Sequence, residues 1–158
     1  MNRNLITAGI ICLAAAALEG ICAGTGIKDY FRRLKWPSYS PPLLAWYAIA
    51  AGYYAILFIC AYRILVRSTT LPFRNIAFAL LLCVVFLNAI WNLLFFRAKN
   101  LAATFVLSVC YSVVVVALWY CLSQFDCIAA AAIGVYGLYL IYANIWSYRL
   151  WRSNVGSA

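Results

Sequence analysis

The 158-residue sequence contains no histidine and only three acidic residues, Glu19, Asp29 and Asp126. Without histidine the chain lacks the commonest general base of enzymes and the commonest protein ligand of transition metals. Charged residues make up only 9% of the chain, whereas soluble domains carry about a quarter. So few charges cannot cover a globular surface in water. The composition therefore excludes a soluble enzyme and a disordered tail, and we predict no catalytic residue and no metal site.

Long apolar segments dominate the remaining sequence, of which 68% is hydrophobic. A helix that crosses a bilayer needs about 20 apolar residues, and in lipid each segment must satisfy its own backbone hydrogen bonds. Five segments meet this length, and they are too long and continuous for the strands of a β-barrel. We predict an all-α membrane protein, a single five-helix bundle over 1–158, with spans at about 5–27, 43–66, 76–96, 101–122 and 127–151.

The connection between the first two spans, 28–42, is the longest and holds three of the four prolines. Proline cannot continue a helix, so we expect this segment to be extended or turned. Its aromatic residues suit the membrane interface. Two interpretations stay open, a simple interfacial anchor or a lid over one mouth of the bundle.

The basic residues lie mostly between the apolar segments, and the net charge is +9. They form no continuous basic face, so we expect contacts with anionic lipid headgroups and no nucleic-acid partner. Five spans divide the connections between two sides of the membrane. Four basic residues fall on the side of the N-terminus and eight on the other side, and basic residues favour the cytoplasmic side. We therefore expect the N-terminus outside and the C-terminus in the cytoplasm.

The third span carries Asn88, Trp91, Asn92 and Phe95 at spacings that place them on one helical face. Carboxamides are costly in hydrocarbon unless they find partners. One interpretation is an interhelical hydrogen bond that holds the bundle together. The other is a polar contact within a ligand cavity that Trp91 lines.

Aromatic residues recur on two further spans, and Glu19 is the only acid deep within a span. Aromatic walls suit flat apolar ligands, although a stripe of rings also suits plain packing. An intramembrane carboxylate indicates a proton or cation site, or else a side chain hydrogen-bonded to a neighbouring helix. The rings are Trp46, Tyr53, Tyr54, Tyr136, Tyr139, Tyr142 and Trp146.

Three motifs occur in a fixed order along the chain. They are L-K-W-P-S-Y-S-P-P at 34–42, N-A-I-W-N-L-L-F-F-R-A-K at 88–99, and A-N-I-W-S-Y-R-L-W-R-S-N at 143–154. In this order, with five spans, the sequence resembles the translocator protein family (TspO/MBR), as a divergent member.

The resemblance implies a five-helix bundle, often a homodimer, in a bacterial inner or mitochondrial outer membrane. It implies a cavity beneath the 28–42 segment that binds tetrapyrroles such as protoporphyrin IX or haem as ligands, with no bound cofactor, and a sterol motif near Tyr148 and Arg152. The ligand contacts carried over, with Asn92 added from the face of the third span, are Tyr39, Trp46, Ala50, Tyr54, Asn88, Trp91, Asn92, Tyr136, Tyr139 and Ala143.

Several positions depart from the family pattern, and Val135 stands where the family has a proline. Ala50 and Tyr139 stand where the family has two tryptophans linked to light-dependent porphyrin breakdown, so we expect no enzyme. Asn92 replaces a proline, and Glu19 replaces a glycine. We expect an integral membrane binding protein, transporter or sensor for hydrophobic ligands. The alternatives are a small proton-coupled exporter that uses Glu19 and a porphyrin-degrading enzyme.

Overall fold

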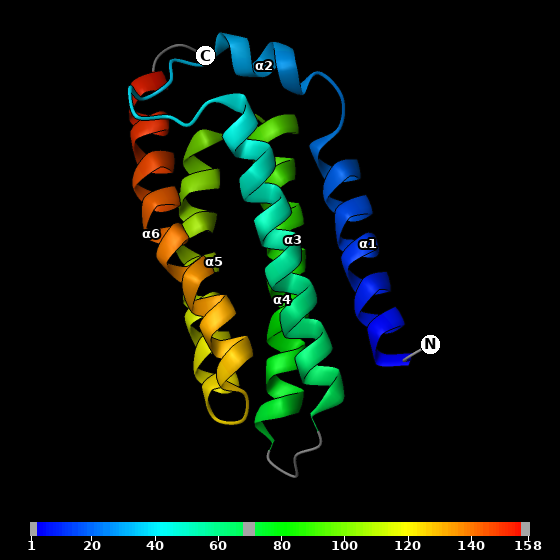
Figure 1. Ribbon diagram of the computed structural model, residues 1–158. Coiled ribbons are helices and arrows are strands. Elements are labelled where there is room, and N and C mark those ends of the chain that lie inside the picture. Colours follow the sequence, from blue (N-terminus) through cyan, green and yellow to red (C-terminus); the bar gives the residue numbers. More distant parts are fainter. Residues whose placement is uncertain (1–2, 68–71, 156–158) are drawn as a thin grey trace.

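The computed structural model describes residues 3–67 and 72–155, and the regular structure in these ranges is entirely helical (Figure 1). The elements are α1 (Arg3–Ala23), α2 (Ile27–Arg33), α3 (Leu43–Val66), α4 (Phe73–Asn92), the π-helical turn η1 (Leu93–Arg97), α5 (Leu101–Ser123) and α6 (Cys127–Asn154). Within the described residues, five helices are long and apolar enough to cross a membrane, with η1 continuing α4. The prediction of an all-α bundle with five membrane spans is confirmed.

The five long helices form a closed ring in the order α1, α3, α6, α5, α4 (Figure 1). The short helix α2 lies across one end of this ring, and the last turn of α3, the first turn of α4 and the connection from α5 to α6 lie at the other end. Helix α1 starts away from α2, whereas α6 ends beside it. The two ends of the chain therefore lie toward opposite ends of the bundle, as an odd number of spans requires.

The outer faces of the long helices carry large apolar side chains such as Leu13, Leu44 and Leu138, each at least 70% exposed. In water these faces would cause aggregation, but they match the hydrocarbon of a bilayer. Buried side chains, both apolar and polar, lie toward the ring's interior, where interhelical packing and hydrogen bonds replace the hydrophobic drive that lipid does not supply.

The first span ends four residues earlier than predicted, and it begins two residues earlier. Helix α1 ends at Ala23 because Gly24 and Gly26 take positive φ angles of 69° and 86°, a region that costs glycine little. A Cβ on Gly24 would lie 3.2 Å from the Arg97 side chain, so the absence of a side chain there also lets η1 approach α1.

The segment between the first two spans is partly helical, which the sequence interpretation missed. Residues 27–33 form α2, and only the proline-containing part after Leu34 is extended or turned. The other predicted spans are correct in number and order. Helix α4 begins three residues earlier than predicted, and α6 continues three residues further.

The end of the bundle away from α2 is closed by an ion-paired carboxylate. Asp126 caps α6 by accepting the Ala129 N–H at 2.9 Å. Arg63 of α3 and Arg67, which directly follows α3, donate to it at 2.9 and 2.8 Å. Burial raises the pKa of Asp126, but these hydrogen bonds and the positive charge of Arg63 outweigh that effect and leave it below its ordinary value.

Candidate functional site

A cavity of about 370 Å³ lies inside the ring of helices, in the half next to α2. All five long helices contribute to its walls, together with α2 and η1. Its volume falls within the range of roughly 300–1,000 Å³ that is typical of small-molecule sites. The cavity is therefore large enough to serve as a ligand site.

Helix α4 and η1 supply one wall of the cavity, and this wall is the helical face predicted from the spacing of four residues in the sequence. Asn88, Trp91, Asn92 and Phe95 all line the cavity. The Trp91 ring stacks on Phe95 with centroids 4.8 Å apart, and its indole N–H donates to Ser108 Oγ at 3.0 Å. This bond fixes the plane of the Trp91 ring against α5.

The backbone of this wall widens into a π-helical turn directly after Asn92. A π-helical turn inserts one residue relative to the α-helix and occurs frequently at functional sites. Here the adjacent residues Phe95 and Phe96 both line the cavity, with their rings nearly perpendicular at 88°. The turn thus brings two consecutive aromatic side chains to one wall.

The two asparagines of α4 leave polar atoms facing the cavity. Asn92 Nδ2 donates to the Asn88 backbone carbonyl at 2.9 Å, but its Oδ1 accepts no hydrogen bond from the described residues. The Asn88 carboxamide likewise has no side-chain partner in that part of the chain. These groups can donate to and accept from a ligand.

Helices α3 and α6 supply the facing walls, which are mainly aromatic. Trp46 contacts Trp146 with ring centroids 4.9 Å apart, and Tyr136 stacks on Tyr139 at 5.9 Å. Ala50 and Ala143 line the same space with small side chains. Such walls present flat apolar surfaces separated by open room.

The deep end of the cavity holds a carboxylate bound by two phenols. Tyr54 Oη donates to Glu19 Oε2 at 2.7 Å, and Tyr53 Oη donates to Oε1 at 3.2 Å. Nearby, the Tyr111 and Tyr136 hydroxyl groups share a hydrogen bond of 2.9 Å. Glu19 is thus hydrogen-bonded to a neighbouring helix, which is one of the two interpretations of the sequence, and its use as a proton site stays a prediction.

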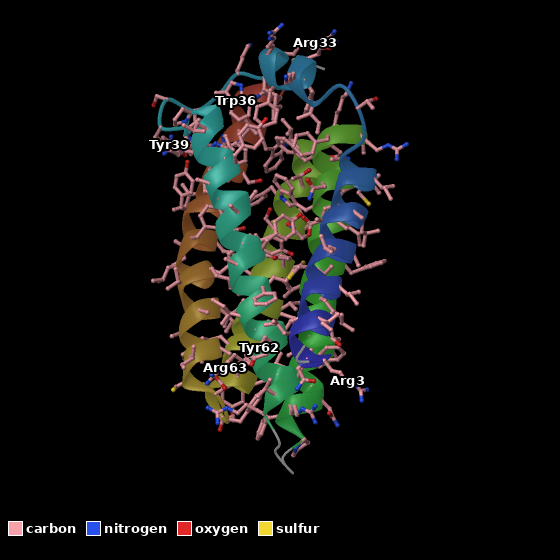
Figure 2. All side chains as sticks on the ribbon, turned by 45° about the vertical axis from the view of Figure 1, so that its right-hand side comes forward. Arg3, Arg33, Trp36, Tyr39, Tyr62 and Arg63 are labelled. Atoms are coloured by element: carbon pink, nitrogen blue, oxygen red, sulfur yellow. The ribbon has the colours of Figure 1, made fainter. Side chains whose placement is uncertain are left out.

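The roof segment, defined here as residues 27–42, covers the other end of the cavity. Ile27 and Phe31 of α2 line the cavity, and Phe31 stacks on Phe96 with centroids 5.8 Å apart. Figure 2 shows Arg33, Trp36 and Tyr39 at this end of the bundle and Arg63 at the opposite end. The position of the segment suits a lid.

Hydrogen bonds tie the roof segment to α6, and one of them runs from the Tyr142 hydroxyl to the Tyr39 carbonyl at 3.3 Å. Lys35 N–H donates to Asn154 Oδ1 and Asn154 Nδ2 donates to the Lys35 carbonyl, both at 3.0 Å. The Trp146 indole N–H donates to Ser40 Oγ at 3.0 Å. These bonds fix Lys35 and Ser40 of the roof segment against α6.

Of the ten ligand contacts predicted from the sequence, all except Tyr39 line the cavity. Tyr39 is 44% exposed, and its ring packs edge-on against Tyr142 outside the cavity. Tyr148 is also exposed on α6, where it contacts Phe105 and Trp151. Tyr148 and Arg152 are therefore separate from the cavity, and sterol binding by them stays a prediction.

Several cavity residues were not predicted, among them Ser108 and Tyr111 of α5 and Asn144 of α6. Asn144 Nδ2 donates to Ser112 Oγ and to the Leu140 carbonyl, while its buried Oδ1 has no partner among the described residues. A polar side chain within an apolar span was the available signal for Ser108 and Asn144. The sequence did not show which helices they would face.

Comparison with known proteins agrees with this architecture. The family model described as the TspO/MBR family matches residues 8–152, which is nearly the whole chain and covers most or all of each long helix. The comparison with curated proteins found no match. Because the family model covers far more than half of the sequence, this integral membrane protein belongs to the TspO/MBR family.

Proposed function

We propose that this membrane protein binds a flat hydrophobic ligand in the cavity, with tetrapyrroles such as protoporphyrin IX as the first candidates. The observation that carries the proposal is the cavity itself, whose walls present the rings of Trp46, Trp91, Tyr139 and Trp146. Aromatic walls with a few polar groups are typical of sites for flat apolar ligands. Stacking would supply the affinity, and the amides of α4 would orient the ligand.

The basic end of the bundle supports a ligand that carries carboxylates at its edge. Eight of the twelve lysine and arginine residues lie at the end next to α2, namely Lys28, Arg32, Arg33, Lys35, Arg97, Lys99, Arg149 and Arg152. Arg32, Arg33 or Lys35 could pair with propionate groups at the cavity mouth. The same asymmetry supports our proposal that this end, with the C-terminus, faces the cytoplasm.

Titration with protoporphyrin IX tests the proposal, with quenching of tryptophan fluorescence as the measurement. We expect saturable quenching by the wild type in nonionic detergent and at least a tenfold weaker affinity for Trp91→Ala, because that variant removes a stacking wall. Trp119→Ala is the matched control, because Trp119 is 46% exposed and lies outside the cavity lining. Absence of saturation, or equal losses in both variants, would refute the proposal.

Binding is proposed ahead of the two alternatives because the cavity supports it directly. Proton-coupled export would require Glu19 to exchange a proton with both sides of the membrane, and uptake of a cationic dye into proteoliposomes by wild type and Glu19→Gln tests this. Porphyrin breakdown is less well supported because Ala50 and Tyr139 line the cavity where the family resemblance places tryptophans. Illumination of the bound complex separates enzymatic loss from slow bleaching.

A further inference from the structure

Glu19 is the one charged side chain among the described residues that line the cavity. It is only 7% exposed, and the two ion pairs found in the described part of the chain both belong to Asp126. A buried carboxylate is costly unless a positive charge or several hydrogen bonds offset its lost hydration. Glu19 therefore has no counter-charge from the lining of its own cavity.

The hydrogen bonds to Glu19 hold the carboxylate in place but do not use all of its capacity to accept hydrogen bonds. A carboxylate accepts about four hydrogen bonds, and the described residues supply two, from the hydroxyl groups of Tyr53 and Tyr54. These two donors come from neighbouring positions on α3, so they approach the carboxylate from one helix. Acceptor capacity thus remains, and Glu19 is itself part of the cavity lining.

Aromatic rings lie next to this carboxylate. The Tyr53 ring lies 5.1 Å from the Tyr54 ring and 5.5 Å from the Tyr136 ring, measured between centroids, and all three residues line the cavity. Ring faces attract organic cations, and such cages are used to bind ammonium groups. A carboxylate beside three phenol rings combines both features that favour a protonated nitrogen.

We infer that the cavity selects ligands carrying a protonated nitrogen, which pairs with Glu19 while the flat apolar body of the ligand lies against the aromatic walls. This inference rests on the proposed function, because it takes the cavity to be a ligand site. It adds that the part of the ligand at the deep end of the cavity is positively charged. The amine N–H groups donate to Glu19, and the positive charge compensates the carboxylate. Ligands that present no cation to Glu19, protoporphyrin IX among them, gain neither interaction and bind through the aromatic walls and the basic mouth of the cavity.

A set of three fluorescent probes of one shape tests the inference. They are 1-pyrenemethylamine, which is cationic at neutral pH, the neutral 1-pyrenemethanol and the anionic 1-pyreneacetic acid. Energy transfer from the cavity tryptophans to pyrene measures binding in nonionic detergent, with empty micelles subtracted. We expect the wild type to bind the amine at least about tenfold more tightly than the alcohol, as a charge-assisted hydrogen bond provides, and the acid more weakly still.

The variant Glu19→Gln removes the charge at nearly constant shape. We expect it to lose the tenfold preference, so that it binds the amine and the alcohol with similar affinity. Asp29→Asn makes the same chemical change on α2, at an exposed site outside the cavity lining, and should keep the preference. Because the wild-type probe series stands alone, a variant that fails to fold does not remove the test.

The outcomes separate this inference from the proposed function. Equal affinity of the wild type for amine and alcohol overturns the inference, as does a preference that persists in Glu19→Gln. If the alcohol and protoporphyrin IX bind in either of those cases, the proposed ligand site still stands. If neither the pyrenes nor protoporphyrin IX show saturable binding, the proposed function fails and the inference fails with it.

Discussion

The two halves of the bundle are built from the same helices but are packed differently. The half away from α2, called the solid half here, is closely packed, and the half next to α2, called the hollow half, contains the cavity. Away from α2, α3 contributes Leu57, Cys60, Ala61 and Ile64, each no more than 2% exposed. Next to α2, the same helix contributes the aromatic residues that line the cavity. Aliphatic side chains of mixed size interdigitate to crystal-like density, whereas rings fixed by stacking and hydrogen bonds cannot collapse into the space between them.

The polar groups of the two halves differ in the same way. In the solid half, both Asp126 oxygens accept hydrogen bonds from paired cations or backbone. In the hollow half, each Glu19 oxygen accepts one hydrogen bond, and the Asn88 carboxamide has no side-chain partner among the described residues. A fully satisfied polar network stabilises a structure, and a partly satisfied one is costly unless something binds to it. The comparison indicates that stability resides in one half and ligand recognition in the other.

The largest expected effect comes from Asp126→Asn in the solid half. The change removes the partner of Arg63 and Arg67 and weakens the cap of α6, so we expect a loss of about 2–4 kcal/mol in the free energy of unfolding. This range already allows for solvent screening of the ion pair with Arg67, whose side chain is 52% exposed. Thermal denaturation in detergent measures it, and Asp29→Asn, which alters an exposed acid on α2, should change little.

The contribution of Asp126 should also depend on pH. Its pKa in the folded protein lies below the ordinary value, so its stabilisation is present above the pKa of the unfolded chain. It is lost as the pH falls through the folded pKa. The wild type should therefore lose stability in acid more steeply than Asp126→Asn. Parallel acid profiles for the two proteins would show that the ion pair contributes nothing.

The next largest effects are expected from two matched substitutions, one in each half of the bundle. Ala61→Leu adds three carbons to a site that is fully buried, and overpacking of this kind costs about 1–3 kcal/mol. Ala50→Leu adds the same carbons to the cavity wall, where open space receives them. We expect Ala61→Leu to lower the melting temperature and keep the affinity for protoporphyrin IX. We expect Ala50→Leu to keep the melting temperature and lower that affinity. Equal destabilisation by both would show that the two halves are packed alike.

The sequence was informative wherever a local pattern decides the structure. Five spans follow from the length of apolar runs, because lipid leaves the backbone few alternatives to helix. The shared face of Asn88, Trp91 and Asn92 follows from helical spacing alone. The end of α1 at Ala23 also had a local signal, since Gly24 and Gly26 are typical of a helix terminus.

The sequence was less informative wherever distant segments meet. Asp126 and Arg63 lie far apart in the chain, and only the pairing of α3 with α6 brings them together. Asn144 turns toward Ser112 of α5 for the same reason. The prediction for Tyr39 relied on motif position, but the turn after Pro37 directs its ring toward Tyr142. Such contacts depend on the helix arrangement, which spacing within one helix does not encode.

The smallest expected effect on stability comes from Asn154→Ala, which releases the roof segment over the hollow half. The variant loses the reciprocal pair of bonds to Lys35, and because these bonds are exposed we expect a cost of about 1 kcal/mol. Global melting should change little, since the solid half is untouched. Hydrogen exchange in residues 28–42 should rise about fivefold, the factor that corresponds to such a change.

The same variant decides between the two roles considered for the roof segment. If the segment is a lid, protoporphyrin IX should enter and leave Asn154→Ala faster than the wild type, with a smaller change in affinity, because opening limits both rates. Stopped-flow quenching measures both rates, and Ser153→Ala, which alters an exposed neighbour on α6, is the matched control. Faster hydrogen exchange with unchanged ligand rates would instead assign the segment to anchoring at the membrane interface.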